Sequence, residues 1–344
     1  MITGASQKLY GGLDLHSSNV YVGIMDGEGK RLYQKRLPTD IEIILKALEP
    51  YQDRLEALAV EATYNWYWLV DGLQEAGYAV RLANPARMQK YEALKVTNDR
   101  SDAFWLAEQL RLGVLPEGYI YPKWIRPVRD MLRRRMLIVR QRTQMLLSLQ
   151  TMTEQIKAAR ISAWRLKSWD LEEIKARFDD PYTVQTLWAM VQLIRKQDIL
   201  ARSLEDKVLE HVRLFDPYDR LLTLPGVGRI LGITIMLETG PIGRFATAGQ
   251  YASYCRTVPS RRESNQKKKG ENNRKNGNRY LGWAYVEAAN FAQRYDPVVR
   301  RWFQRKLVRS CRVVAIKALA CKLSKAAYYI LRDGVEYEPR MLFG

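Results

Sequence analysis

The stretch that decides the fold class is LYGGLDLHSSNVYVGIMDGEGKRLYQKRL, residues 9–37. Apolar and β-branched residues predict strands over Leu9–His16, Val20–Met25 and Arg31–Leu37. The intervening SSN and DGEG segments contain residues that favour tight turns. We therefore predict a three-stranded meander, and Asp14 is a charged residue within its otherwise apolar first strand.

Helices and strands alternate over the residues that follow. Helical spacing predicts helices over Thr39–Tyr51, Tyr64–Ala76, Ala86–Leu94 and Ser101–Leu112. Short apolar runs predict strands over Arg54–Glu61 and Tyr78–Ala83. The order β-β-β-α-β-α-β-α is typical of a mixed α/β sheet of the ribonuclease H type, in which the first and fourth strands are neighbours. We expect residues 1–115 to form this α/β domain.

The sequence pattern over residues 116–215, the middle of the chain, predicts a linker and two long helices. The segment Pro116–Pro127 is aromatic, contains Pro and is expected to be irregular. Val128–Gln155 and Thr183–Leu214 carry apolar stripes at helical spacing and are joined by a segment expected to be short and irregular. Such stripes suit either packing within one chain or a coiled coil between two chains, and both uses stay open.

The last part, residues 216–344, predicts a compact all-α domain. It begins with helical stretches around LPGVG at 224–228 and contains a basic loop at Ser260–Asn278. Amphipathic helices are expected near Pro297–Arg309 and Val313–Leu331.

The positive charge of the chain is concentrated in two stretches. The formal net charge is +19, and Ile120–Gln150 and Arg256–Arg279 each carry a net +7. Local excess of this size indicates a polyanion as partner, and we expect nucleic acid. A membrane is not expected, because the basic stretches lack a strongly apolar face and no run of 18 apolar residues occurs. We see no signal peptide in Met1–Tyr10 and expect a cytoplasmic protein.

Histidine and cysteine are too scarce for a zinc site or a two-histidine catalytic scheme. The chain has two histidines, His16 and His211, and three widely spaced cysteines, which we expect to be reduced. Any metal would therefore be held by carboxylates, which suit hard ions such as Mg²⁺.

Four acidic residues are candidate metal ligands. Asp14 and Glu61 lie on the predicted first and fourth strands, and Asp99 and Asp102 share one face at the start of a helix. Carboxylates gathered at one end of neighbouring strands repel one another. Two Mg²⁺ ions about 4 Å apart, with Mn²⁺ as an alternative, would relieve that repulsion. The alternative interpretation is unrelated surface acids, with Asp99 as a helix N-cap.

Two further motifs indicate contact with phosphate. Gly226 and Gly228 of LPGVG are typical of a helix-hairpin-helix turn, although the same pattern also occurs in turns that bind nothing. The loop PSRRESN contains Ser260 and Ser264 in strongly cationic surroundings, where a serine either contacts DNA without a covalent role or acts as a nucleophile. The residues expected to contact nucleic acid are Gly226, Gly228, Arg133, Arg134, Arg135, Arg261, Arg262, Lys267, Lys268, Lys269, Arg274, Lys275 and Arg279.

The motifs GLDLHS, VEAT, NDRSDA, LPGVG and PSRRESN…NGNRYL, in this order and spacing, resemble the insertion-sequence family 110 transposases. The resemblance extends over roughly residues 9–331. It implies an N-terminal RuvC-like (ribonuclease H fold) domain, a coiled-coil region and a C-terminal transposase domain with a helix-hairpin-helix. Carried over by motif, the acidic tetrad of these DEDD recombinases falls on Asp14, Glu61, Asp99 and Asp102.

The family's serine nucleophile corresponds to Ser264. It follows Pro259 at the spacing of the family pattern P-x-x-x-x-S-G, which Ser260 does not match. The chain departs from the family at Asn265, where the family has Gly, and at 256–258, where Arg-Thr-Val replaces the usual Gly-Leu before the Pro.

The resemblance implies a Mg²⁺-dependent DNA recombinase of an insertion sequence that works through a phosphoserine intermediate. The implied partners are the element ends and target DNA, a noncoding bridge RNA as guide, and further copies of the chain in a dimer or tetramer. In the family, one site combines the acidic and serine domains of different protomers. The residues themselves leave two alternatives, a RuvC-like junction nuclease that uses water and a non-catalytic nucleic-acid-binding protein.

Overall fold

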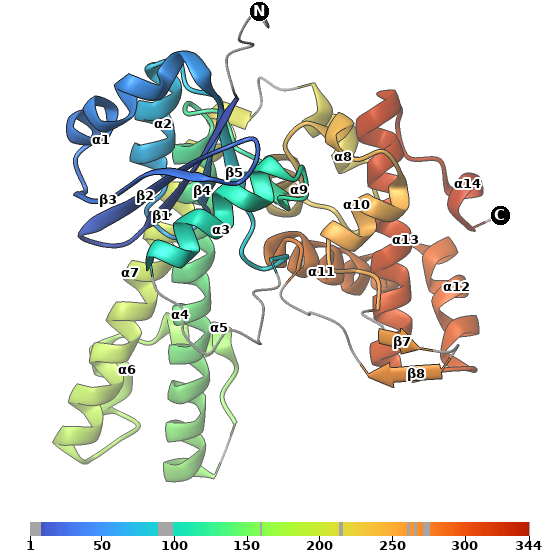
Figure 1. The fold of residues 1–344 in the computed structure, drawn as a ribbon. Helices are drawn as coiled ribbons and strands as arrows, with labels where there is room; N and C mark the ends of the chain where they lie inside the picture. Colours follow the sequence, from blue (N-terminus) through green and yellow to red (C-terminus); the bar gives the residue numbers. More distant parts are fainter. Residues whose placement is uncertain are drawn as a thin grey trace, which may run out of the picture. The chain divides into compact units, whose positions relative to one another are not determined.

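A computed structural model describes residues 8–88, 99–158, 160–212, 216–259, 262–264, 267–270 and 276–343. Within these ranges, the side chains at 99, 100, 262–264, 268, 341 and 343 lie outside the description. The chain divides into two compact units, Met1–Lys123 and Trp124–Gly344 (Figure 1). Each unit is considered by itself.

The first unit is built on a six-stranded mixed sheet of order β3-β2-β1-β4-β5-β6. The strands are β1 (Leu9–Leu15), β2 (Asn19–Asp26), β3 (Arg31–Pro38), β4 (Leu55–Glu61), β5 (Val80–Ala83) and β6 (Glu117–Gly118). The meander β1-β2-β3 is antiparallel, whereas β1, β4 and β5 are parallel to one another. The predicted meander and the predicted pairing of the first and fourth strands are confirmed.

Strand β6 lies in the segment that was expected to be an irregular linker. Glu117 and Gly118 pair with Ala83 and Leu82 of β5 in antiparallel register. The prediction was wrong here because a two-residue edge strand is held by backbone hydrogen bonds alone and has no apolar alternation to reveal it.

Helices cover both faces of the sheet. Helices α1 (Ile41–Leu48) and α2 (Tyr67–Glu75) bury Ile44, Leu48, Leu69 and Leu73 in one core with the strands. A 3₁₀ helix, η1 (Glu49–Arg54), follows α1, which begins after an N-cap at Asp40. Helix α3 (Asp99–Arg111) lies against the other face, where it contacts β1, β2 and β4.

The helix expected at Ala86–Leu94 does not begin where predicted. The described part, up to Met88, is a turn in which the Asn84 side chain accepts a hydrogen bond from the backbone of Ala86, and the Asn84 carbonyl accepts one from Arg87. An Asn-Pro pair favours this turn over a helix start, which explains the error. Positions 89–94 lie outside the described residues.

Gly12 allows α3 to lie directly against β1. A Cβ atom at this position would lie 2.0 Å from the carbonyl oxygen of Ala103 and 2.8 Å from the backbone nitrogen of Ala107. Neither atom can move without displacing the helix. The absence of a side chain at Gly12 therefore sets the distance between α3 and the sheet.

We expect Gly12→Ala to destabilise the protein by about 3 kcal/mol, because overpacking would push α3 from the sheet. Urea unfolding of the variant would measure the loss. Gly27→Ala is the matched control, since a Cβ there meets nothing nearer than the Lys8 carbonyl at 4.0 Å. Equal stability of the two variants would contradict the packing argument.

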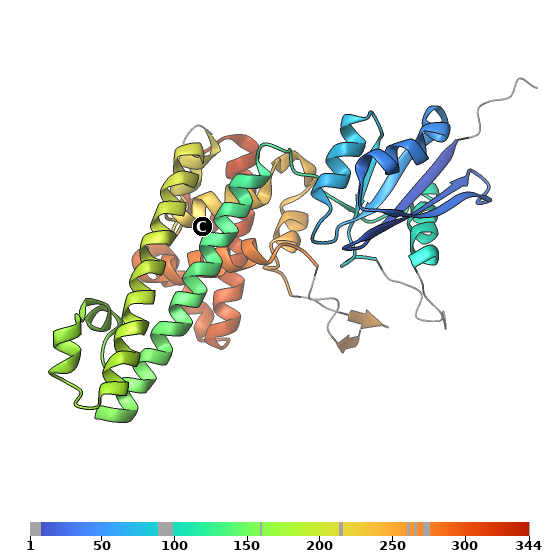
Figure 2. The same cartoon turned by 90° about the vertical axis from the view of Figure 1, so that its left-hand side faces the viewer.

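The second unit begins with two long helices that lie side by side (Figures 1 and 2). Helices α4 (Arg126–Lys157) and α7 (Pro181–Val212) confirm the predicted pair. Their apolar stripes pack within one chain, where Leu149 of α4 joins Leu187, Val191 and Ile194 of α7 in one core.

Two short helices occupy the connection that was expected to be irregular. Helices α5 (Ala163–Ser168) and α6 (Leu171–Lys175) begin at the side-chain caps Ser162 and Asp170. Leu166, Trp169 and Ile174 fill the space beside α4 and α7. Helices of one or two turns are too short to show a period, so only the caps signalled them.

The rest of the unit is a helical domain around one core. Its elements are α8 (Pro217–Leu222), α9 (Arg229–Thr239), η2 (Ile242–Arg244), α10 (Ala248–Tyr254), β7 (Arg262–Ser264), β8 (Lys267–Gly270), α11 (Arg279–Tyr295), α12 (Pro297–Leu307), α13 (Arg312–Asp333) and α14 (Pro339–Phe343). The last two predicted amphipathic helices correspond to α12 and α13. Among the helices that the structure describes, none is both long and apolar enough to cross a membrane.

Candidate acidic site and serine hairpin

Asp14 and Glu61 occupy neighbouring positions at the carboxyl ends of two parallel strands. Leu13 of β1 is in register with Val60 of β4, so the next residue on each strand is a carboxylate. Leu13 and Val60 belong to the core with α1 and α2. Because side chains alternate along a strand, Asp14 and Glu61 point to the opposite face, which α3 covers.

Helix α3 brings a third carboxylate to this edge. Ala103 lies against Gly12, two residues before Asp14, and Asp102 precedes Ala103 in the first turns of the helix. Asp99 begins the same helix, but its side chain lies outside the described residues. The structure therefore brings Asp14, Glu61 and Asp102 together at one end of the sheet.

The Asp14 carboxyl is buried, with 4% of the residue exposed. Its pKa is raised from 3.8 to about 6, mainly by burial. The charges of Glu61 and Asp102 add to this rise, whereas nearby His16 opposes it. The His16 ring Nε2 lies 3.1 Å from Asp14 Oδ2 at hydrogen-bond distance. A buried carboxylate surrounded by two others is a place where a cation would be favoured.

His16 also connects the ends of β1 and β4. Its carbonyl accepts a hydrogen bond from Asn65 Nδ2 at 3.1 Å, and the Thr63 hydroxyl donates to Asn65 Oδ1 at 3.0 Å. The loop that follows Glu61 is thereby held against the residues that follow Asp14. From the sequence, His16 was weighed only for a zinc site or a two-histidine catalytic scheme. The Asp-x-His spacing could have suggested the role seen here.

The carboxylates suit a hard divalent cation by their donor chemistry. Oxygen ligands that carry negative charge are those Mg²⁺ prefers, and the mutual repulsion around Asp14 is what such an ion would relieve. Among the described side chains, however, no group of three or more His, Cys, Asp or Glu stands in ready metal-binding geometry. The side chain of Asp99, the fourth predicted ligand, lies outside the described side chains.

Ser264 lies at the tip of a β-hairpin, in the segment that was expected to be a loop. It is the last residue of β7 and pairs in antiparallel register with Lys267, the first residue of β8. Glu263 pairs with Lys268. A strand of three residues rich in charge shows no alternation of apolar residues, which is why the pattern did not predict it.

The predicted cationic residues around the serine are described only in part. Lys267, Lys269 and Arg279 are exposed, whereas Arg262 and Lys268 are placed by their backbone alone. Positions that lie outside the described residues are Ser260, Arg261, Asn265, Arg274 and Lys275.

The two ends of the segment that carries the hairpin are fastened together at its base. Arg256 adopts a positive φ of 56°, and its Nε donates to the carbonyls of Asn276 and Gly277 at 3.0 and 3.1 Å. The Asn278 backbone N–H donates to the Tyr254 carbonyl at 2.6 Å. The hairpin is therefore presented from a closed base between α10 and α11.

The buried carboxylate of Glu238, on α9, fixes this base by accepting hydrogen bonds from α4 and from Asn278. Its Oε2 accepts from Asn278 Nδ2 at 2.7 Å and from Arg129 Nη2 at 2.9 Å, and its Oε1 accepts from Arg133 Nε at 2.6 Å. Burial alone would raise the pKa of Glu238, but hydrogen bonds and positive charge from Arg133 and Arg129 lower it overall. The guanidinium of Arg133 also lies 4.5 Å over the ring of Tyr280.

Neither Glu238 nor Asn278 was predicted from the sequence as a functional residue. The signal was present, because Glu238 is the one acidic residue in the apolar run ILGITIMLET, as Asp14 is in β1. Arg133 and Arg135 were predicted to contact nucleic acid, but both have carboxylate partners within the chain. Arg133 pairs with Glu238 at 2.6 Å, and Arg135 pairs with Glu205 at 2.9 Å. Arg134, between them, is exposed, and nucleic-acid contact by these residues stays a prediction.

Gly226 and Gly228 have different structural roles. Gly226 has a φ of 78°, and a Cβ there would lie 2.1 Å from the Ala288 carbonyl of α11. Helix packing therefore already requires glycine at this position. Gly228 is the N-cap of α9, and open space surrounds the place of its missing Cβ, which leaves the helix N-terminus accessible.

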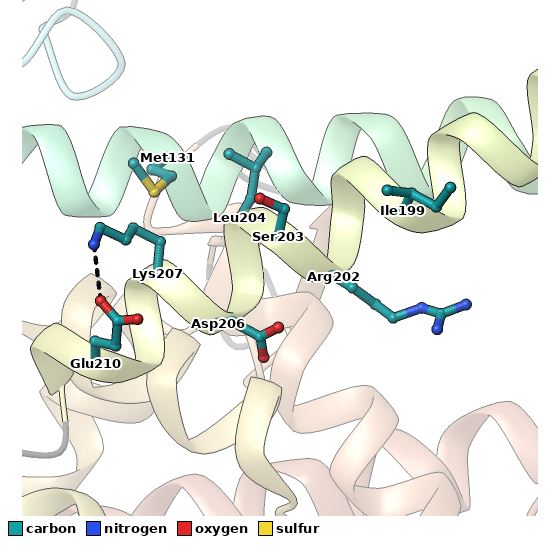
Figure 3. Close-up of a pocket in the computed structure, with 8 residues that line it drawn as sticks. All are labelled: Met131, Ile199, Arg202, Ser203, Leu204, Asp206, Lys207 and Glu210. Carbon is teal, nitrogen blue, oxygen red and sulfur yellow. Dashed lines mark hydrogen bonds and ion pairs between the residues drawn. The ribbon is translucent and has the colours of Figure 1, made fainter.

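A surface pocket lies along α7, where Met131 of α4 adjoins it (Figure 3). Its volume is about 610 Å³, and its other lining residues are Ile199, Arg202, Ser203, Leu204, Asp206, Lys207 and Glu210. Lys207 and Glu210 form an ion pair at 2.9 Å. None of the described site residues predicted from the sequence lines this pocket.

Two family models match the chain in the regions that carry these features. Residues 11–157 match the model of the DEDD transposases of IS110 type, and residues 218–304 match the model described as "Transposase IS116/IS110/IS902 family". The first match spans all four acidic residues and the second spans Ser264.

The relatives agree. The chain is 27% identical over 272 residues to y4qE of Sinorhizobium fredii, a transposase by name. The aligned region covers 75% of this chain and 64% of y4qE. The chain is 31% identical over 125 residues to the uncharacterized 43.6 kDa protein of insertion element IS110 from Streptomyces coelicolor. The aligned region covers 36% of this chain and 31% of that protein. A family 20 transposase by name from Pseudomonas aeruginosa is 25% identical over 82% of this chain and 86% of its own length. The chain belongs to the IS110 family of transposases.

Proposed function

We propose that this protein is a transposase that cleaves and exchanges DNA strands at the ends of an insertion element. The observation that carries the proposal is the meeting of Asp14, Glu61 and Asp102 at one edge of a sheet, within a region that matches the DEDD model. A buried acid whose pKa is raised by neighbouring carboxylates, as that of Asp14 is, is costly for folding and is typical of a functional site.

We propose Mg²⁺, with Mn²⁺ as an alternative, as the ion that Asp14, Glu61, Asp99 and Asp102 hold, one or two ions per site. When bound, the ion supplies positive charge for the oxygens of the scissile phosphate. The His16 ring orients the Asp14 carboxylate through their hydrogen bond, and Asn65 keeps the loop after Glu61 in place.

Ser264 is the proposed nucleophile. Its Oγ loses the hydroxyl proton and forms a bond to phosphorus, while the bond from phosphorus to the departing sugar oxygen breaks and that oxygen takes up a proton. The product is a strand joined to the serine, and its phosphodiester energy is retained for rejoining. The position of Ser264 beside Lys267 at a hairpin tip supports this role, because exposed cations attract the DNA phosphates.

Other partners belong to the same proposal. Exposed Arg134, Lys267, Lys269 and Arg279, together with the free N-terminus of α9 at Gly228, would contact phosphate. We further propose a noncoding bridge RNA as guide, and a dimer or tetramer in which the acidic and serine domains of different protomers form one site.

The test is a suicide DNA substrate with a nicked or bridging-sulfur phosphate, followed by denaturing electrophoresis for a protein–DNA adduct. We expect Ser264→Ala to lower adduct yield by about 10³-fold or more, because no other group replaces a lost nucleophile. Ser260→Ala, in the same cationic segment, is the matched control and should keep the adduct.

The other outcomes identify the alternatives. Undiminished strand cleavage by Ser264→Ala, without an adduct, would point to a junction nuclease that uses water. DNA binding with no cleavage by the wild-type protein, with or without divalent metal, would indicate a non-catalytic binding protein.

A further inference from the structure

A third basic stretch of the chain covers the end of α11, all of α12 and the first part of α13. Residues 294–325 contain ten basic residues and one acidic residue. On α12, Val299 and Phe303 are buried, whereas Arg300, Arg301 and Arg305 are exposed. At helical spacing these three arginines share the outward side of the helix.

No carboxylate neutralises this side of α12 within the described part of the chain. The single acid between Glu287 and Asp333 is Asp296, whose Oδ1 accepts hydrogen bonds from the backbone of Val298 and Val299 and caps the helix. This differs from α4, where Arg129, Arg133 and Arg135 have carboxylate partners. The charge of α12 is therefore free to attract an external anion.

Two exposed aromatic rings adjoin these arginines. Phe291 and Tyr295, on the last turns of α11, are 41% and 76% exposed, and their rings are nearly parallel, 15° apart, with centroids 6.4 Å apart. Arg300 donates from Nε and Nη2 to the carbonyls of Gln293 and Arg294, so it folds over the end of α11. The rings and the cations therefore belong to one surface.

We propose that this surface, the α11–α12 corner (Phe291, Arg294, Tyr295, Arg300, Arg301 and Arg305), binds an unpaired DNA strand. Arginines bind the phosphates, and exposed rings offer faces on which unpaired bases stack, whereas the bases of a duplex already stack on each other. Strand exchange exposes unpaired DNA, so the choice of DNA as the polymer rests on the proposed function. The corner then holds a displaced strand while the chemistry proceeds.

The test measures binding of a short unstructured oligonucleotide to the full chain by fluorescence anisotropy at several salt concentrations. Arg300→Gln, Arg301→Gln and Arg305→Gln together should reduce the slope of log K against log salt by about 2, because each phosphate contact on a single strand contributes about 0.7. A matched control removes the same charge from exposed positions beside α4 and on α7, with Arg160→Gln, Lys196→Gln and Arg202→Gln. The control should leave the slope unchanged.

The rings are tested separately. Tyr295→Ala should weaken single-strand binding about tenfold without changing the salt slope, since stacking involves no counterion release. Binding of the matching duplex should not change. Tyr182→Ala, which removes an equally exposed ring from α7, is the control and should have no effect on either DNA.

Three results would overturn the proposal. Equal loss of slope in the two arginine variants would assign the effect to net charge alone. If Tyr295→Ala weakened duplex and single-strand binding equally, the argument for unpaired DNA would be lost. If RNA of the same sequence bound more tightly than the DNA, and this binding was lost in the corner variants, the surface would be assigned to RNA. These readouts involve binding only, so they are independent of whether Ser264→Ala abolishes the adduct.

Discussion

Asp14→Asn is expected to abolish strand cleavage and, at the same time, to make the metal-free protein more stable at pH 7.5. The activity loss should be on the order of 10³-fold, because the variant would remove a charged ligand from the proposed metal site. The gain in stability follows from burial and from repulsion by Glu61 and Asp102, which together raise the pKa of Asp14 from 3.8 to about 6. A shift of this size corresponds to about 3 kcal/mol at 1.36 kcal/mol per pH unit.

The pH dependence follows from the direction of this shift. Between pH 4 and 6 folded Asp14 holds its proton while the unfolded chain has lost it, so stability of the wild-type protein falls as pH rises through this window. The Asn variant lacks this fall. The two proteins should therefore be similarly stable below about pH 4 and differ most above pH 6.

Thermal unfolding in EDTA across this pH range measures the effect. Asp26→Ala is the matched control: Asp26 is as buried as Asp14, but its carboxylate accepts hydrogen bonds from the backbone of Glu28 and Lys30, so its loss should destabilise the protein. Added Mg²⁺ should stabilise wild type more than Asp14→Asn. Destabilisation by Asp14→Asn at pH 7.5 would mean that Asp14 is a structural carboxylate.

Glu238→Ala is expected to have the largest effect on stability, a loss of about 3–5 kcal/mol, because it leaves buried positive charge without a partner. Glu238 is 1% exposed and accepts hydrogen bonds from Arg129, Arg133 and Asn278. Asn278 caps α11 and closes the base of the serine hairpin, so the loss should also loosen the hairpin.

Chemical unfolding, with limited proteolysis at the hairpin as a second readout, tests this expectation. Glu238→Gln should cost less, since an amide keeps one oxygen acceptor for the arginines. Glu210→Ala is the control, because Glu210 forms an exposed pair with Lys207 and pairs of that kind contribute little. A loss at Glu238 no greater than at Glu210 would contradict the role given to the buried carboxylate.

The local pattern of the sequence was sufficient for the main elements of the first unit. Apolar and β-branched runs separated by turn residues over 9–37 predicted β1, β2 and β3, and an acid within each of two apolar strands pointed to Asp14 and Glu61. Strands that are buried on both faces, as β1 and β2 are, favour apolar and β-branched runs, so such strands can be read without tertiary information. Pairing of β1 with β4 followed from the order of the elements.

Elements without such a period escaped the sequence. Strand β6 and the β7–β8 hairpin are held by backbone hydrogen bonds to a neighbouring strand, which any side chain permits. The false helix start at Ala86 shows the reverse case, where apolar spacing suggested a helix but the Asn84 side chain closed a turn.

The sequence by itself therefore determined strands β1 to β5, the pairing of β1 with β4, the long helices and the identity of the charged candidates. Only the tertiary structure decided which charges are neutralised within the chain, because the partners of an ion pair can be far apart in sequence. Arg133 and Glu238 are 105 residues apart and meet in the interior, whereas Arg300, Arg301 and Arg305 have no such carboxylate in the described structure. A count of arginines cannot separate these two groups, since their difference depends on what the fold brings beside each one.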